Sequence, residues 1–289
     1  MKLNIYIFST LLTSLFTSVI LLSSCSIIEP AAPSPTYLQI DSFRVTSDFA
    51  VSGSSSNKIS DVWLIVDGVY LGTFPLPCKI PIADGGQHSF IIRAGIVENG
   101  ISSIRSAYVK YTSFDTIINM NVGQTYKVLP KIEYNSFNTY PNKEDFEDAS
   151  LDLVSTSTGN TPLTIITAPD PNVFEGNSGM VTLADTNTVF EVASVTPFTL
   201  PLNSTTYIEL NYKSDVDFTI GTFVTTFSVI RQDLLNLRAT NVWKKVYINV
   251  NDLGGVLDNG TSYKFYIHAE KPSTLVSANL YFDNFKVVY

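Results

Sequence analysis

The chain has 289 residues, and 15% of them are charged, against about 25% in ordinary soluble domains. Acidic residues outnumber basic ones by 26 to 18, a net charge of −8, which argues against nucleic acid as a partner because phosphates require clustered Lys and Arg. With two Cys and two His, neither a zinc site nor a His-dependent catalytic triad is expected. The length predicts two domains behind a leader over residues 1–24.

The leader has the pattern of a secretory signal, in which Lys2 precedes an apolar stretch over residues 5–22. It ends in Leu22-Ser23-Ser24-Cys25, which resembles the lipobox of bacterial lipoproteins. The resemblance implies that the signal peptide is removed and that acyl chains attached at Cys25 anchor the protein in a membrane. A single transmembrane helix is the alternative, although no Lys or Arg follows within residues 26–36 to stop transfer.

The residues around Cys25 also predict where the protein lies. Residues 25–36 contain three prolines and form an extended tether. Some Gram-negative lipoproteins of this type are kept in the inner membrane by an Asp after the lipidated Cys, and Ser26 stands there instead. We therefore expect a cell-envelope protein in the outer membrane. Cys78, with no His or acid beside it, is interpreted as a packed, inert thiol.

Residues 37–131 read as a small Ig-like β-sandwich. Short runs rich in Val, Ile, Thr, Tyr and Phe are separated by Gly, Asn, Asp and Pro. Asp67-Gly68 between two such runs predicts a hairpin with a type I′ turn, which needs positive φ angles. Further turns are predicted at Glu98-Asn99-Gly100, before a strand over residues 101–109, and at Asn121-Val122-Gly123.

The first hairpin resembles the PEGA-type module of bacterial surface proteins. The similarity rests on Val66-Asp67-Gly68, Tyr70, Gly72 and Pro75, followed by Gly86-Gln87-His88 before a strand. Such modules are not known as catalysts, so the resemblance implies a spacer. His88, at the start of a strand, is interpreted as structural.

Residues 132–289 read as a jelly-roll β-sandwich. Strand-like runs and no helical periodicity predict a two-sheet fold; the runs are 181–183, 188–192, 207–212, 218–229, 242–250, 263–269 and 278–288. Four landmarks in this half resemble those of galactose-binding-like and carbohydrate-binding-module jelly rolls. They are Phe146-Glu147-Asp148, the Gly-rich segment 175–180, Trp243-Lys244-Lys245-Val246-Tyr247 and Tyr281-Phe282-Asp283-Asn284-Phe285.

The resemblance implies two binding functions for the jelly roll. A structural Ca²⁺, which takes six to eight oxygen ligands, would be held by Glu147, Gly176, Asn177 and Asp283; the alternative is that both acids only cap strands. A glycan would stack on aromatic rings, for which the candidates are Tyr207, Trp243, Tyr247 and Tyr266. The alternative for each ring is a place in the core. His268 is expected to be a surface or packed residue.

No nucleophile elbow, phosphate loop or zinc signature is present in the sequence, so an enzyme is not expected. We expect a lipid-anchored envelope protein whose jelly roll binds a glycan without catalysis. The alternative is a structural or assembly lipoprotein that holds a protein partner, for example by strand addition.

Overall fold

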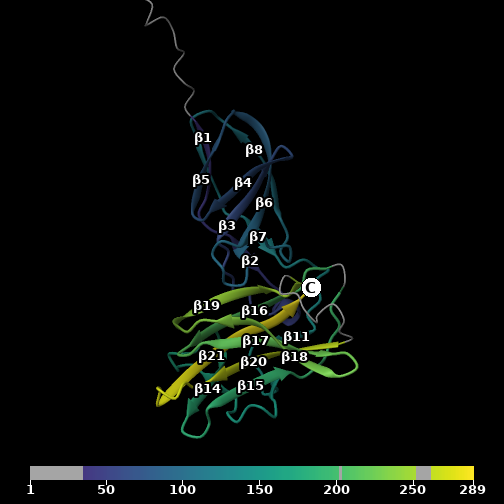
Figure 1. Ribbon diagram of the computed structural model, residues 1–289. Coiled ribbons are helices and arrows are strands. Elements are labelled where there is room, and N and C mark those ends of the chain that lie inside the picture. Colours follow the sequence, from purple (N-terminus) through teal and green to yellow (C-terminus); the bar gives the residue numbers. More distant parts are fainter. Residues whose placement is uncertain (1–34, 202–203, 252–261) are drawn as a thin grey trace, which may run out of the picture.

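The computed structural model describes residues 35–201, 204–251 and 262–289. Nearly all regular structure in these ranges is β-strand, and the one described helix is the four-residue α2 (Phe49–Ser52). The strands form two β-sandwiches placed end to end (Figure 1). The predicted all-β class, with a small sandwich followed by a jelly roll, is confirmed. The predicted signal peptide and Cys25 lie outside the described residues.

The first sandwich is built from short strands, and its core contains Leu38, Val62, Phe90 and Ile92. The strands are β1 (Thr36–Ile40), β2 (Arg44–Thr46), β3 (Asp61–Val66), β4 (Val69–Pro75), β5 (Cys78–Ile82), β6 (Gly86–Val97), β7 (Arg105–Ala107), β8 (Phe114–Met120), β9 (Thr125–Val128) and β10 (Lys131–Glu133). They pair as β5-β1-β9, as β4-β3-β6-β7 with β8 also on β6, and as β10-β2. Because β10 pairs with β2, strand pairing in this sandwich extends to Glu133.

The turns of the first sandwich depend on residues that tolerate positive φ. Asp67 and Gly68 have φ angles of 51° and 81° and join β3 to β4, as the hairpin prediction requires. Asn99 and Gly100 also have positive φ, but the following strand β7 spans only three residues of the expected 101–109. His88 Nδ1 lies 2.7 Å from Oδ2 of Asp67, so this ring ties the hairpin turn to β6.

The second sandwich packs two sheets around an aromatic core that includes Phe190, Phe218, Phe265 and Phe282. Its strands are β11 (Asn142–Glu144), β12 (Leu153–Ser155), β13 (Thr164–Thr167), β14 (Asn177–Ala184), β15 (Val189–Ser194), β16 (Tyr207–Ser214), β17 (Phe218–Thr225), β18 (Val229–Leu237), β19 (Thr240–Asn249), β20 (Ser262–Glu270) and β21 (Ser277–Val288). One sheet has the order β13-β14-β21-β16-β19, with β11 also on β21. We call it the interface sheet because it contacts the first sandwich. The other, β12-β15-β20-β17-β18, we call the exposed sheet.

The exposed sheet contains the largest difference from the expected strands. The run 218–229 is not one strand but the hairpin β17–β18, which turns at Thr226–Ser228. The turn has no Gly, Pro or Asn; instead the backbone N–H and the hydroxyl of Thr226 both donate to the carbonyl of Ser228, at 2.8 and 3.1 Å. A side-chain hydroxyl therefore substitutes for the usual turn residues.

The two sandwiches meet through a buried charge network centred on Glu209 of β16. Tyr108 donates to Oε1 of Glu209 at 2.6 Å, Tyr134 donates at 2.9 Å, and Nζ of Lys245 lies 2.7 Å from Oε2. Lys286 donates to the carbonyl of Ser52. Burial acts to raise the pKa of Glu209, but Lys245 and Lys286 outweigh it and hold that pKa below its usual value.

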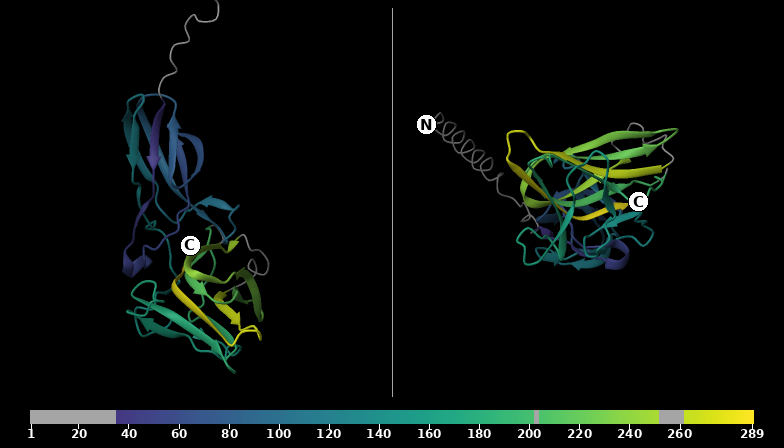
Figure 2. Two further views of the ribbon diagram at one scale, coloured as in Figure 1. Left: turned by 90° about the vertical axis from the view of Figure 1, so that its left-hand side faces the viewer. Right: turned by 90° about the horizontal axis from the view of Figure 1, so that it is seen from below.

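A second set of contacts links the same surfaces through backbone atoms. Asn99 donates its N–H to the carbonyl of Tyr247 at 2.8 Å, and Lys58 donates its N–H to the Tyr247 hydroxyl at 3.0 Å. Asn249 donates its N–H to Oδ1 of Asn99 at 2.9 Å. The two sandwiches thus share hydrogen bonds as well as apolar packing, and the left view of Figure 2 shows the second sandwich beyond one end of the first.

Candidate functional site

Two of the predicted stacking rings belong to this interface. Tyr207 and Tyr247 are 2% and 1% exposed, and the ring of Tyr108 lies 4.9 Å from each of theirs. The Tyr207 hydroxyl donates to Glu98. The prediction that these two rings stack on a sugar is wrong, because the period-two pattern places them on the outer face of the sheet that the first sandwich covers.

Trp243 lies on the interface sheet and is half-buried. Its ring centroid is 5.2 Å from that of Phe174 and 6.4 Å from that of Tyr281. The three rings form an aromatic cluster on the outer face of β19 and β21. A ligand-binding role for Trp243 stays a prediction.

The predicted calcium residues fall into two groups. Glu147 accepts the N–H of Asn177 at 2.9 Å, and a Cβ on Gly176 would lie 1.9 Å from Oε1 of Glu147, so this carboxylate fills the Gly-rich turn. Asp283 is buried and accepts from the hydroxyl of Ser178 at 2.8 Å. Among the described residues, no three His, Cys, Asp or Glu side chains gather as a metal site would require. The turn thus offers Glu147 an amide hydrogen, and calcium binding stays a prediction.

Asp283 has an unusual electrostatic environment. Burial, with the nearby charge of Glu175 as a smaller contribution, raises the pKa of Asp283 to about 8. Glu175 in turn accepts from the hydroxyl of Ser54 at 2.6 Å, across the junction between the sandwiches. The two acids therefore lie at the rim of the interface.

The outer face of the exposed sheet is the strongest candidate for a site. The pairing register aligns its outward side chains in three successive rows across the strands. The rows are Arg231–Phe223–Lys264, then Asp233–Gly221–Tyr266–Ala193, then Asn236–Thr219–His268–Glu191.

Tyr266 forms the centre of this face. A Cβ on Gly221 would lie 2.0 Å from the Tyr266 ring, so the ring lies flat across the backbone of β17. The guanidinium of Arg231 lies 4.4 Å from the centre of the ring and Phe223 packs 4.9 Å away, while the Tyr266 hydroxyl donates to Asp233. Burial, with that hydrogen bond, raises the pKa of Tyr266 above its ordinary value.

This packing corrects the fourth predicted ring. Tyr266 is on the candidate face but has no exposed surface, so the prediction that it stacks on a sugar is wrong. Its ring supports the guanidinium of Arg231, whose side chain is 38% exposed. Arg231 is therefore the group of this face that reaches solvent. Its planar guanidinium presents N–H donors in a fixed geometry.

Glu191 fixes the polar groups around Tyr266. Its carboxylate is fully buried and accepts from the hydroxyl of Thr156 at 2.6 Å; Nη2 of Arg231 lies 3.2 Å from it and Nδ1 of His268 lies 3.1 Å from it. Gly159 packs closely on the backbone of Glu191, since a Cβ on Gly159 would lie 2.6 Å from the Glu191 nitrogen. Donors held by a buried carboxylate need little reordering when a ligand binds.

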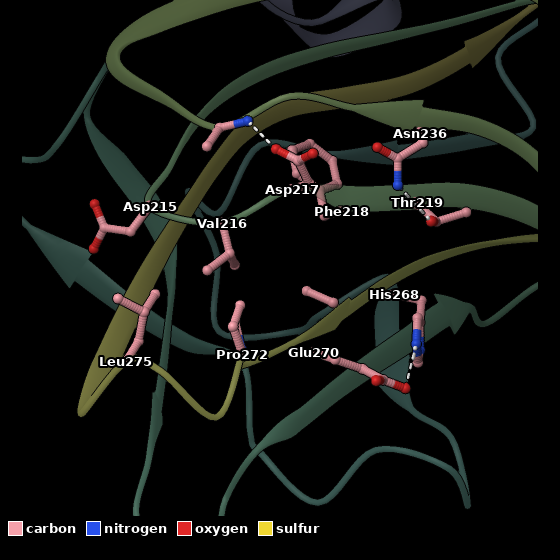
Figure 3. A pocket seen from close by; sticks show the side chains of 12 residues that line it. Asp215, Val216, Asp217, Phe218, Thr219, Asn236, His268, Glu270, Pro272 and Leu275 are labelled. Carbon is pink, nitrogen blue, oxygen red and sulfur yellow. Dashed lines mark hydrogen bonds and ion pairs between the residues drawn. The ribbon is translucent and has the colours of Figure 1, made fainter.

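Two hollows flank this cluster on either side. The acidic hollow, about 500 Å³, is shown in Figure 3, and the Phe223 hollow has a volume of about 450 Å³. The acidic hollow is lined by Asp215, Asp217, Asn236, His268, Glu270 and Leu275, among others. The Phe223 hollow is lined by residues that include Val154, Ala193, Pro197, Phe223, Val229 and Lys264.

Sequence reasoning missed most of this face because it missed β18. That strand supplies Arg231, Asp233 and Asn236. A signal was present: Ile230-Arg231-Gln232-Asp233 alternates uncharged residues with charged ones, as an edge strand with one exposed face does. His268 is half-buried on this face, between Glu191 and Glu270.

No protein family and no curated protein matches the chain. Among solved structures, a family 11 carbohydrate-binding module from Clostridium thermocellum, in complex with a β-1,3-1,4-mixed-linked tetrasaccharide, is 15% identical with a TM-score of 0.35 and covers 52% of this chain and 94% of that module. A family 61 module in complex with β-1,4-galactotriose is 14% identical, with a TM-score of 0.31 and coverage of 47% and 85%. The enzymatically active domain of tailspike protein 4 of bacteriophage CBA120 is 9% identical with a TM-score of 0.38; the match spans 50% of this chain and 20% of that domain.

In the part of the chain that the structure describes, no helix is long and apolar enough to cross a membrane.

Proposed function

We propose that the chain is an envelope protein that binds a glycan, without catalysis, on the outer face of the exposed sheet. The observation that carries this proposal is the row of fixed polar groups between two hollows, in which Glu191 and Tyr266 hold Arg231 toward solvent. Sugars present hydroxyls at their edges and apolar C–H groups on their faces, so a sugar site combines oriented polar groups with aromatic surface.

The hollows provide both kinds of contact. Phe223 supplies a half-buried ring, whereas Asn236 and His268 supply amide and imidazole groups at the other side of the cluster. The three rows cross several strands, so an extended oligosaccharide can contact all of them at once. A binding module needs no reacting pair of carboxylates, and the buried Glu191 serves here to orient its neighbours.

The binding test uses both sandwiches together, as residues 26–289 without the lipid-bearing Cys25, because the interface sheet would otherwise expose its charge network. A glycan array should give a signal confined to one class of sugar. Phe223→Ala and Asn236→Ala should each cost 1–2 kcal/mol, about tenfold in affinity. Phe174→Ala, which removes a ring that packs on Trp243 of the interface sheet, is the matched control and should bind normally.

Two outcomes would count against glycan binding on the exposed sheet. Silence on the array from protein with a cooperative melting transition would oppose it, and so would binding that is lost in the Phe174 variant but kept in the Phe223 variant. The second outcome would move the site to the aromatic cluster around Trp243.

The lipid anchor is the other part of the proposal. The tether leads into β1, which lies in the first sandwich, the unit that Figure 1 places above the second. An anchor at Cys25 would therefore put the first sandwich between the membrane and the glycan face. Cys25→Ala should move the protein from the membrane fraction to the soluble fraction, and a variant that stays in the membrane would favour the transmembrane alternative.

One observation favours the protein-partner function as a second candidate. Strand β4 is at the edge of its sheet and exposes Val69, Tyr70 and Leu71. An edge strand with apolar side chains can accept a further strand from another protein. A photo-crosslinker at Tyr70 should then trap one partner in intact cells, and Val69→Lys should abolish the cross-link if the candidate is correct.

A further inference from the structure

The Phe223 row places an aromatic ring between two cations. Phe223 on β17 pairs with Arg231 on β18 and with Lys264 on β20. Directly paired residues of neighbouring strands point to the same face, so the ring lies between a guanidinium and an ammonium group. Arg231 is shared with Glu191 and Asp233, at 3.2 and 2.7 Å.

Lys264, by contrast, has no counter-ion among the residues that the structure describes. Of the described residues, none forms a hydrogen bond or ion pair with its Nζ, and it is the one charged side chain among those that line the Phe223 hollow. The neighbouring walls combine apolar side chains, such as Val154, Ala193 and Pro197, with uncharged Ser and Thr residues. A cation beside apolar surface gains more from an anionic partner than a cation in open water does.

The opposite side of the cluster has the opposite charge. The acidic hollow contains Asp215, Asp217 and Glu270, and the chain as a whole carries a net charge of −8. A negatively charged ligand is therefore repelled from most of the surface and from one of the two hollows. The Phe223 hollow is where its charge is neutralised.

We infer that the Phe223 hollow takes an acidic sugar residue, a uronate or a sulfated hexose, whose ring face packs on Phe223 and whose anionic group binds Lys264. The ligand class is thus an anionic glycan bound with fixed polarity, its charged residue at Phe223 and a neutral residue at the acidic hollow. This inference rests on the proposed function and narrows it.

The experiment is affinity electrophoresis of the mature chain in matched polymer pairs that differ in charge. The pairs are polygalacturonate and its methyl ester, carboxymethyl and hydroxyethyl cellulose, and dextran sulfate and dextran. We expect tighter binding to the charged member of at least one pair by about tenfold, the size of one charge-assisted hydrogen bond. Raising the salt concentration should narrow that difference.

Variants assign the preference to one side chain. Lys264→Met should lower the affinity for the charged polymer to that for its neutral counterpart. Lys127→Met, at an exposed lysine of β9 in the first sandwich, should change nothing. Because none of the described residues forms a hydrogen bond or ion pair with Nζ of Lys264, this variant should melt like the wild type.

The outcomes separate this inference from the proposed function. Binding to neutral polymers alone, or a charge preference that survives Lys264→Met, overturns the acidic-sugar inference and leaves glycan binding in place. Equal loss in the Lys264 and Lys127 variants shows non-specific attraction and also overturns the inference. No binding to any polymer by folded protein overturns both.

Discussion

The two sheets of the second sandwich differ in whether the partners of their outward-facing carboxylates reach solvent. On the interface sheet, Glu209 is enclosed by two tyrosine hydroxyls and by the ammonium group of Lys245, and the first sandwich covers all of them. On the exposed sheet, Glu191 is just as buried, but its partner Arg231 faces solvent.

The difference shows how function can be located among buried charges. Breaking a buried ion pair is costly whether or not it has a function, so burial of a carboxylate alone does not indicate a site. The informative feature is a partner with unused hydrogen-bonding capacity. Arg231 and Lys264 have it, whereas the groups around Glu209 use theirs to join two domains.

The largest expected effect is on the interface sheet. Glu209→Ala should lower the free energy of unfolding by about 3–5 kcal/mol, because it leaves Lys245 in a covered site without its counter-ion. Urea unfolding at pH 7 measures the change. Glu133→Ala, at an exposed glutamate of the first sandwich, should stay within about 0.5 kcal/mol of the wild type.

The pH dependence gives the same test a second readout. Because the folded state holds the pKa of Glu209 below its ordinary value, this group stabilises the fold above the unfolded pKa of about 4.3, and the stabilisation is lost as the pH falls through the folded pKa. The difference between the wild type and Glu209→Gln should therefore shrink in acid. A constant difference would show that Glu209 acts through packing instead of charge.

A smaller effect is expected on the exposed sheet. Gly221→Ala puts a methyl group into the Tyr266 ring, and overpacking of this kind costs about 1–3 kcal/mol. Tilting the ring also moves Arg231, so glycan affinity should fall with stability. The double variant Gly221→Ala/Tyr266→Ala should be more stable than the sum of the single effects predicts; strict additivity would show that the ring does not rest on Gly221.

The sequence predicted the architecture better than the site, and the reason lies in what each depends on. Alternation and turn residues such as Asp67-Gly68 act locally, so strands and hairpins could be read directly. Whether Tyr207 or Tyr247 faces solvent depends on which sheet the first sandwich covers, and no local pattern contains that information.

Strand β18 illustrates a second limit. Its preceding turn uses the hydroxyl of Thr226 in place of Gly or Asn, and the β-branched residues around it suggested a continuous strand. With β18 unseen, Arg231 and Asp233 had no predicted neighbours. Tyr266 was predicted to lie in the site. Its position beneath Arg231 depends on Gly221 of β17, which pairs with it, and no motif in the sequence marks that pairing.

The rim of the interface should respond to pH in the opposite sense from Glu209. Burial raises the pKa of Asp283 to about 8, so its contribution to stability is complete below the unfolded value of about 3.9 and is lost as the pH rises through 8. Asp283→Asn should therefore gain stability relative to the wild type progressively as the pH rises from 4 to 8. Unfolding curves across this range measure it, and a pH-independent difference would contradict the raised pKa.

Calcium gives the smallest expected effect and tests the same rim. If an ion bridges Glu147 and Asp283, adding it at several times its dissociation constant stabilises the fold by about 1 kcal/mol. A chelator should then lower the melting temperature of the wild type but not of Glu147→Gln. An unchanged melting temperature in both would leave Glu147 as the acceptor for the Asn177 amide. Asp283 would then be a buried acid that keeps its proton up to about pH 8.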